Sequence, residues 1–185
     1  MIELLPWSDD DLWAVERFLS DSEMMKHLGG PQSREQIVQQ HERYMNADAS
    51  GTGQMFKIVL SPATDAIGSI GYWDKIWREE LVHETGWMIL PEYQGQGLAS
   101  DALTLLVERL RRDHMHRFLH AFPSVTNGPS NALCRKAGFI NLGESDFEYP
   151  AGHPLRCNDW RVDLSRGPDH PQPQSAARFV REAVR

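Results

Sequence analysis

The sequence predicts an α/β domain in which a mixed, mostly antiparallel sheet of six or seven strands carries helices on both faces. Three observations favour this fold. Strand-like apolar segments alternate with amphipathic helical segments, hairpins stand near both ends of the pattern, and a glycine-rich turn joins a short apolar strand to the longest helix. At 185 residues the chain is long enough to bury one core, so we expect a single domain over residues 1–165.

The first half of the chain predicts three strands and two helices. The helices follow from apolar residues at helical spacing and from their caps, Ser8 or Asp9 for the first and Ser33 for the second, with Gln36 as the capping-box partner of Ser33. Short alternating segments around a turn predict a hairpin. The expected elements are a strand over 1–6, a helix over 9–19, a helix over 33–45, a loop over 47–54, and strands over 55–60 and 66–73.

The second half predicts a central strand, the longest helix and three further strands. Residues 74–81 are charged but carry Trp77, and we expect them to bulge over the functional face of the sheet. The long helix has one leucine-rich face, an acidic first turn and a basic last turn, as the helix dipole favours. The expected elements are a strand over 83–90, helices over 98–112 and 129–136, and strands over 117–122, 139–149 and 156–164.

The turn Gln94-Gly95-Gln96-Gly97-Leu98-Ala99 is the most informative segment. A glycine-rich turn that leads into a helix offers unpaired backbone N–H groups at the positive end of the helix dipole, which favours a phosphate. A mononucleotide loop is excluded because no Lys-Ser/Thr pair follows, and a dinucleotide fingerprint is excluded because Ser100 stands at the third glycine position. The alternative is an ordinary strand-to-helix turn.

The positions of Gln94, Gly97 and Ala99 fit Q/R-x-x-G-x-G/A, which resembles the acetyl-CoA pyrophosphate loop of the GNAT superfamily of N-acetyltransferases. Residues 127–139 resemble the second family signature at five positions, which are Asn127, Ser130, Lys136, Gly138 and Phe139. Residues 24–31 resemble the branch of ribosomal-protein N-terminal acetyltransferases. The resemblance covers about residues 1–165. It implies that the fourth and fifth strands splay apart, with acetyl-CoA as cosubstrate in the gap. The histidines do not cluster with carboxylates at metal spacing, and His114 and His116 at a helix end favour a solvated surface over a zinc site, so we expect no metal.

The resemblance also implies which residues hold acetyl-CoA. Backbone groups of Met88 and Leu90 are expected to pair with the pantetheine arm. Asn127 and Asn131 are candidates for contacts to that arm, with helix capping as the alternative. The pyrophosphate is expected on the amides of the turn and the first helical residues, and Gly97 would allow close backbone approach; these residues are Gly95, Gln96, Gly97, Leu98, Ala99 and Ser100.

Glu84 is the candidate general base, since several family branches place a carboxylate ten residues before the turn and strand alternation puts it on the face of Met88. The alternative is a strand-end glutamate paired with a lysine or arginine. His83 and His120 are rival bases, with a structural role as the alternative. Cys134 stands where many members carry a tyrosine that acts as the acid. Its thiol either donates a proton or only packs in the core, and the hydroxyl of Ser130 nearby is the second candidate for the proton donor.

The expected activity is transfer of an acetyl group from acetyl-CoA to a primary amine, directly within a ternary complex. The acceptor is a small amine or a peptide N-terminus, between which the sequence does not decide, and a non-catalytic acyl-CoA sensor is the rival class. We expect the acceptor pocket to involve residues 24–31, 73–77 and 147–156. Trp73 and Trp77 form an aromatic wall there, or Trp73 closes the hairpin core.

Composition narrows the partners. The formal net charge is −7, which argues against nucleic acid and membrane as partners and suits a cationic acceptor. The two cysteines have no CxxC spacing, no signal pattern opens the chain, and no apolar run approaches 18 residues, so we expect a cytoplasmic protein. We expect His114 and His116 to lie on the solvent-exposed surface. Residues 166–185 predict a Pro-rich linker and a short helical tail, which can dock on the domain or on a second copy in a homodimer.

Overall fold

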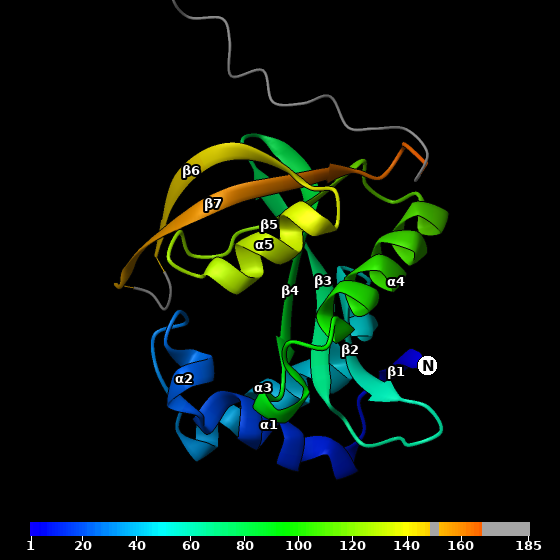
Figure 1. Cartoon of the computed structure of the whole chain (residues 1–185), viewed down its shortest axis with the longest axis vertical. Coiled ribbons are helices and arrows are strands. Elements are labelled where there is room, and N and C mark those ends of the chain that lie inside the picture. The colour runs from blue at the N-terminus through cyan, green and yellow to red at the C-terminus, as the bar shows by residue number, and fades with distance from the viewer. Residues whose placement is uncertain (149–151, 168–185) are drawn as a thin grey trace, which may run out of the picture.

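The computed structural model describes residues 1–148 and 152–167 (Figure 1). The linker beyond residue 167 and the helical tail expected over 175–185 lie outside the described residues. The elements, in chain order, are β1 (Ile2–Pro6), η1 (Asp9–Asp11), α1 (Leu12–Ser20), α2 (Ser22–Met25), α3 (Arg34–Asn46), η2 (Ala47–Ser50), β2 (Gly53–Leu60), β3 (Gly68–Trp77), β4 (Glu80–Ile89), η3 (Pro91–Tyr93), α4 (Leu98–Asp113), β5 (Phe118–Ala121), α5 (Gly128–Lys136), β6 (Ile140–Glu148) and β7 (Pro154–Asp163), where η marks a 3₁₀ turn.

The strands form one seven-stranded sheet in the order β1-β2-β3-β4-β5-β7-β6. Its neighbours pair antiparallel except β4 and β5, which are parallel and pair only at His83 with Leu119 and at Glu84 with His120. Beyond Glu84, β4 continues to Ile89 without β5 beside it. The expected mixed sheet with splayed fourth and fifth strands is therefore confirmed.

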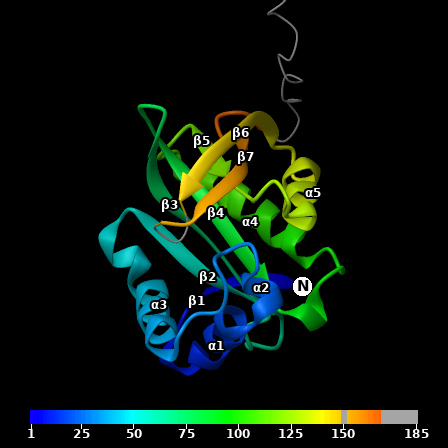
Figure 2. The same cartoon turned by 90° about the vertical axis from the view of Figure 1, so that its left-hand side faces the viewer.

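Helices cover both faces of the sheet, also as expected (Figure 1, Figure 2). On one face α4 and α5 enclose the larger core, to which β4 contributes Trp87 and Ile89. On the other face α1, α2 and α3 enclose a second core, to which Met88 and Leu90 contribute. Because side chains alternate along a strand, Glu84 shares the face of Met88, whereas the neighbouring His83 shares the face of Trp87.

Local cap chemistry explains the starts of the N-terminal helices. Ser33 and Gln36 form the expected capping box. The first helix begins at Leu12 rather than at residue 9, because the Asp11 carboxylate accepts hydrogen bonds from both the amide and the hydroxyl of Ser8 and holds residues 9–11 in a 3₁₀ turn. The short helix α2 was not expected; Asp21 caps it by accepting a hydrogen bond from the amide of Met24.

The bulge expected over residues 74–81 is wrong. The strands β3 and β4 continue as a regular hairpin until Trp77 pairs with Glu80. Arg78 and Glu79 form the two-residue turn, with φ angles of 49° and 68° that match the right-handed twist of the strands. Arg-Glu is not a typical sequence for such a turn, which is why the pattern did not predict it. The hairpin carries Lys75 and Trp77 alongside Glu84.

Among residues 1–148 and 152–167, no helix combines the length and the apolar character needed to cross a membrane.

Candidate active site

The glycine-rich turn lies at the exposed start of α4. Gly95 and Gly97 have φ angles of 74° and 83°, which side-chain-bearing residues rarely adopt, and a Cβ on either would meet no protein atom within 4 Å. Within the described part of the chain, the backbone amides from Gly95 to Ala99 donate to no protein group, whereas those of Ser100 and Asp101 both reach the Gly97 carbonyl. The turn is thus an open set of N–H donors at a helix N-terminus, which suits a pyrophosphate.

The side chain of Gln94 braces this turn. Its Nε2 atom donates to the backbone carbonyl of Ile89, at 2.9 Å, and so fixes the turn to the end of β4. The Gln96 side chain similarly donates to the carbonyl of Glu92, at 3.1 Å. Both glutamine side chains therefore support the turn, and the amides remain the groups that face outward.

The backbone groups that face the gap differ from those expected. The amide of Leu90 donates to the carbonyl of Ile67, at 2.9 Å, so it is occupied by the chain segment before β3. Because peptide groups alternate along a strand, the groups of Met88 also point toward β3, and those of Trp87 and Ile89 point into the gap. The backbone groups that face the gap are thus those of Trp87 and Ile89, each one residue before the position that the resemblance implied, Met88 or Leu90.

The two asparagines of α5 have structural roles. Asn127 caps the helix by accepting a hydrogen bond from the amide of Ser130, at 3.1 Å. Asn131 is buried: its Nδ2 donates to the carbonyls of Ser124 and Asn127, and its Oδ1 accepts from Asn158 and Trp160. With both amide hydrogens and the oxygen engaged, Asn131 offers nothing to a cofactor, so that expectation is corrected to its capping and packing alternative.

Cys134 packs in the core between α5 and the sheet and is fully buried. Burial raises the pKa of its thiol to about 12. A side chain without solvent or ligand access cannot protonate a leaving group, so of its two predicted roles the packing role holds. Ser130 is half-buried in the first turn of α5 and remains the predicted proton donor.

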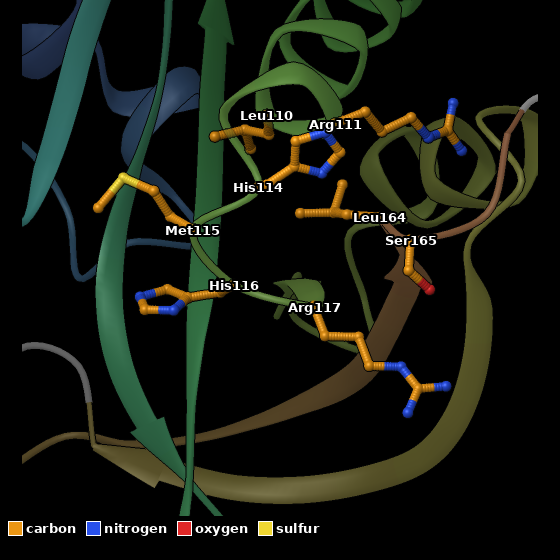
Figure 3. A pocket seen from close by; sticks show the side chains of 8 residues that line it. All are labelled: Leu110, Arg111, His114, Met115, His116, Arg117, Leu164 and Ser165. Carbon is orange, nitrogen blue, oxygen red and sulfur yellow. The ribbon is translucent and has the colours of Figure 1, made fainter.

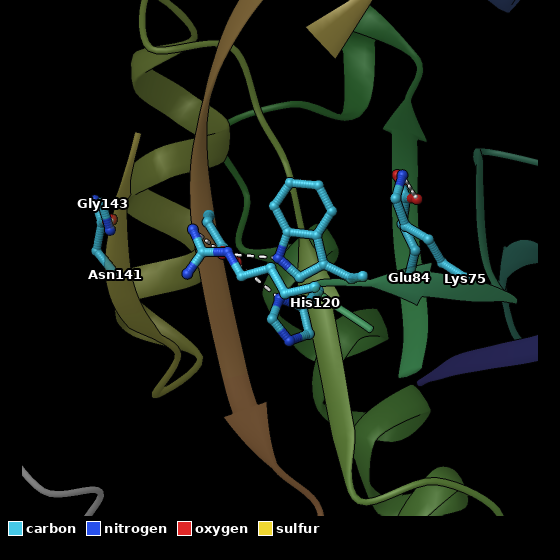
Figure 4. A network of polar contacts seen from close by, with 8 residues as sticks. Lys75, Glu84, His120, Asn141 and Gly143 are labelled. Atoms are coloured by element: carbon cyan, nitrogen blue, oxygen red, sulfur yellow. Dashed lines mark hydrogen bonds and ion pairs between the residues drawn. The ribbon is translucent and has the colours of Figure 1, made fainter. Parts of the chain in front are cut away.

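Glu84 lies where β4 and β5 part, and it holds an ammonium group. Its Oε2 atom is 2.6 Å from Nζ of Lys75, which projects from β3, and both side chains are partly exposed (Figure 4). The alternative in which Glu84 pairs with a lysine is therefore present in the structure, and the lysine is Lys75. Glu84 is thus an ion-paired carboxylate at the point where the two strands separate.

Three aromatic rings surround the same ammonium. Lys75 Nζ lies 4.9 Å from the centre of the Phe122 ring, 5.1 Å from that of Phe147 and 5.9 Å from that of Trp77. The Trp77 and Phe147 rings are stacked, with centres 5.1 Å apart. We call Trp77, Phe122 and Phe147 the aromatic cage. Such rings attract cations by about 0.5–2 kcal/mol each, more where water is excluded.

A buried histidine–aspartate pair supports the cage from below. Asp159 Oδ1 is 2.7 Å from Nδ1 of His120, and its Oδ2 accepts from Nε1 of Trp77 at 3.0 Å (Figure 4). Burial would raise the pKa of Asp159, but the hydrogen bonds from His120 and Trp77 outweigh burial and lower it. His120 is paired with Glu84 across β4 and β5 and shares its face of the sheet, but its Nδ1 is engaged by Asp159. Sequence reasoning missed Lys75, Phe122 and Asp159, because no local pattern connects them.

His83 is not part of this site. It lies on the opposite face of the sheet, with a relative exposure of 1%. Burial and the nearby His116 lower its pKa. A base on that face cannot reach an acceptor held at Glu84, so His83 is removed as a rival.

The remaining expected acceptor segments flank the cage. Trp73 lies opposite Glu84 on β3 and is 38% exposed, so it does not close a hairpin core. In the segment over 24–31, Nδ1 of His27 is 3.3 Å from Oγ1 of Thr126, which connects the segment after α2 to the loop before α5. Part of the segment over 147–156 lies outside the described residues.

The comparisons with known proteins agree with this geometry. The family model for the acetyltransferase (GNAT) domain matches residues 2–140. The uncharacterized N-acetyltransferase YnaD of Bacillus subtilis (strain 168) is 26% identical over 151 residues, which are 81% of this chain and 82% of that protein.

Two solved structures share the fold. RimL, a ribosomal alpha-N-protein acetyltransferase in complex with coenzyme A, has a TM-score of 0.73 at 20% identity, covering 88% of this chain and 93% of that one. A spermidine N-acetyltransferase from Vibrio cholerae, in complex with CoA and spermine, has a TM-score of 0.73 at 17% identity, covering 89% and 96%. With the family model spanning most of its length, this chain belongs to the GNAT acetyltransferases and is an acyltransferase enzyme.

Proposed function

We propose that this enzyme transfers the acetyl group of acetyl-CoA to the nitrogen of a primary amine, directly and within a ternary complex. One observation carries the proposal: where β4 and β5 separate, the Glu84 carboxylate holds a primary ammonium inside an aromatic cage. An acceptor ammonium placed there would meet the group suited to remove its proton, at the edge of the gap proposed for the cosubstrate.

The residues present fit acetyl-CoA. The open amides of the turn and the N-terminus of α4 would hold its pyrophosphate, and the positive φ angles of Gly95 and Gly97 keep side chains away from the phosphates. The gap-facing backbone groups of Trp87 and the amide of Ile89 would pair with the pantetheine arm, since the Ile89 carbonyl already accepts from Gln94. One of these amides would also donate to the thioester oxygen as negative charge develops there.

The chemistry needs little beyond this placement. Glu84, directly or through a water molecule, takes a proton from the acceptor ammonium, and the freed lone pair attacks the thioester carbonyl carbon. The carbon–sulfur bond then breaks and the acetyl group stays on nitrogen, which gives up its second proton to solvent as the amide forms. The CoA thiolate is protonated, with Ser130 as the proposed donor, and Ser130 regains its proton from solvent. Holding both reactants in one site supplies much of the rate by proximity.

The cage favours an acceptor with a cationic head on an apolar stem. Lys75 has this form, and the acceptor would compete with it for Glu84. A polyamine and a peptide N-terminus both present such a group, and the structural neighbours include an enzyme named for each. The net charge of −7 favours a cation on approach.

A panel of amines and peptides, with release of the CoA thiol as the readout, tests the proposal. We expect turnover with at least one primary amine and a loss of at least about 100-fold in kcat/KM for Glu84→Gln, with unchanged affinity for acetyl-CoA. Glu80→Gln is the matched control, since Glu80 is an exposed glutamate of the same strand. Equal turnover by parent and Glu84→Gln would remove the assigned base.

A non-catalytic acyl-CoA sensor is the second candidate, and the burial of Cys134 is the observation that favours it, because the family's usual acid position is closed. The same panel separates the two. Tight acetyl-CoA binding with no transfer to any acceptor would support the sensor, whereas any efficient transfer would exclude it.

A further inference from the structure

Three potential metal ligands converge on the face of the sheet opposite Glu84. Asp74 comes from β3, His83 from the paired position of β4, and His116 from the loop between α4 and β5. Their ligand atoms all lie within 4.8 Å of one another. Asp74 Oδ1 is 3.1 Å from Nδ1 of His83 and 3.0 Å from Nε2 of His116. Three segments distant in sequence thus present three ligand atoms to one point.

His83 is the independent sign that a ligand belongs here. Its side chain is 1% exposed, yet among the described residues neither ring nitrogen makes a hydrogen bond. Nδ1 lies 3.1 Å from Asp74 Oδ1 but does not meet hydrogen-bond geometry, and the same oxygen is engaged by His116. A buried imidazole without a partner is costly, so its presence needs an explanation.

We propose that Asp74, His83 and His116 bind a divalent first-row transition-metal ion such as Zn²⁺. Imidazole nitrogens with one carboxylate oxygen are a preferred donor set for these ions. Metal–ligand bonds of about 2.0–2.1 Å at tetrahedral angles place donor atoms roughly 3.3 Å apart, close to the two spacings around Asp74 Oδ1. An ion at this point would give His83 the partner that it lacks.

The site is accessible from one side. Side-chain exposure is 20% for Asp74 and 13% for His116, so an ion can enter from that side while His83 closes the bottom. The ring of His116 is directed toward the strands and away from Arg117, which lines the neighbouring surface cavity (Figure 3). Three protein ligands leave one tetrahedral position for water.

The ion would act on structure rather than in the reaction. It would tie the β3–β4 hairpin to the loop that leads into β5. His83 directly precedes Glu84, so the ion would fix the backbone that presents the proposed base from the far side of the sheet. A metal-free alternative exists, in which His116 donates to Asp74 and simply secures the loop; it leaves His83 without a partner.

Titration with Co²⁺ tests the proposal directly, because tetrahedral Co²⁺ with nitrogen and oxygen ligands absorbs visible light. The sample is the full chain, free of any purification tag and treated with a chelator. His116→Asn is the test variant, chosen because His116 lies in a loop and is less critical for folding than His83. His114→Asn is the matched control, since His114 is exposed, two residues away, and in a left-handed conformation that asparagine tolerates.

We expect one Co²⁺ per chain with visible absorption in the parent and in His114→Asn, and at least about 100-fold weaker binding in His116→Asn and Asp74→Asn. Zn²⁺ at a hundredfold excess over its Kd should raise the melting temperature of the parent by about 5–10 °C and leave that of His116→Asn unchanged. Absence of a saturable signal in the parent overturns the site. Equal binding by His116→Asn, or its loss in His114→Asn, also overturns it. Neither readout depends on acetyl transfer.

Discussion

Burial distinguishes the residues that can act in transfer from those that can only pack. Cys134 and Glu84 were both predicted as catalytic residues. Cys134 is fully enclosed and its thiol pKa is raised to about 12 by burial, whereas Glu84 keeps a partly exposed carboxylate 2.6 Å from an ammonium. A group that carries a proton must reach its substrate. We therefore assign proton transfer to Glu84 and core packing to Cys134.

Cys134→Ala should therefore leave kcat within about twofold of the parent. It should lower the free energy of unfolding by about 1 kcal/mol, because it removes one buried sulfur atom and leaves a small cavity. Steady-state kinetics and urea unfolding measure the two effects. A drop in kcat of tenfold or more in the fully folded variant would restore Cys134 as the acid.

Asn131 should be far more important to stability than Asn127. Asn131→Ala leaves the buried Nε1 of Trp160 and the amide of Asn158 without their acceptor, which should cost about 2–4 kcal/mol. Asn127→Ala removes one helix cap and should cost about 1 kcal/mol. Urea unfolding of both variants checks the order. Equal costs would contradict the role of Asn131 as a hydrogen-bonding centre.

Single-residue roles were predictable where one local motif defines them. The glycine-rich turn was predicted because its residues lie in one strand–turn–helix unit, whereas the role proposed for Glu84 came from the family resemblance. The cage was not predictable, because Lys75 on β3, Phe122 just after β5 and Phe147 on β6 are brought together only by the order of the strands in the sheet. The same limit hid the cluster of Asp74, His83 and His116.

Short elements depend on contacts that are both local and distant. The capping box of Ser33 and Gln36 was predicted because both partners lie within one turn. The 3₁₀ turn over 9–11 was not, since it is held by the buried ion pair of Asp11 with Lys57 of β2, whose Nζ lies 2.8 Å from both carboxylate oxygens. This ion pair anchors the start of α1 to the sheet.

That anchor should make stability depend on pH in the acid range. Burial would raise the pKa of Asp11, but the hydrogen bonds from Lys57 and Ser8 outweigh burial and lower it. Because the folded pKa lies below the unfolded value of about 3.9, the stabilisation is complete above that value and is lost as pH falls through the folded pKa. Asp11→Asn should lower the free energy of unfolding by about 3 kcal/mol at neutral pH. Between about pH 5 and pH 3 the free energy of unfolding should fall less steeply for this variant than for the parent. Urea unfolding across this range checks it; parallel curves for parent and variant would contradict the sign.

At the scale of the whole molecule, one departure from regular sheet pairing organises the site. The strands β4 and β5 pair at two positions and then separate, which opens the gap (Figure 1). The larger core includes residues from both sides of this gap, whereas the second core lies on the opposite face of the sheet. The glycine turn stands beyond the C-terminal end of β4, and the cage with Glu84 stands where the strands part. The alternation of strands and helices predicted a mixed sheet with helices on both faces, and the resemblance to the GNAT superfamily implied the separation of β4 and β5. The extent of the hairpin that carries Lys75 and Trp77 followed only from the structure.

The proposed function requires that the turn around Gly97 binds the pyrophosphate of coenzyme A. Calorimetric titration of coenzyme A into three proteins measures this binding. The proteins are the parent, Gly97→Glu, and Gly51→Glu as the control, because Gly51 also has a positive φ of 67° and open space around it. We expect the parent and Gly51→Glu to bind coenzyme A with equal affinity. Gly97→Glu should bind it at least about 100-fold more weakly, because its carboxylate would repel the phosphates. A parent that ignores coenzyme A, or a Gly97→Glu variant that binds it as tightly as the parent, would contradict the account.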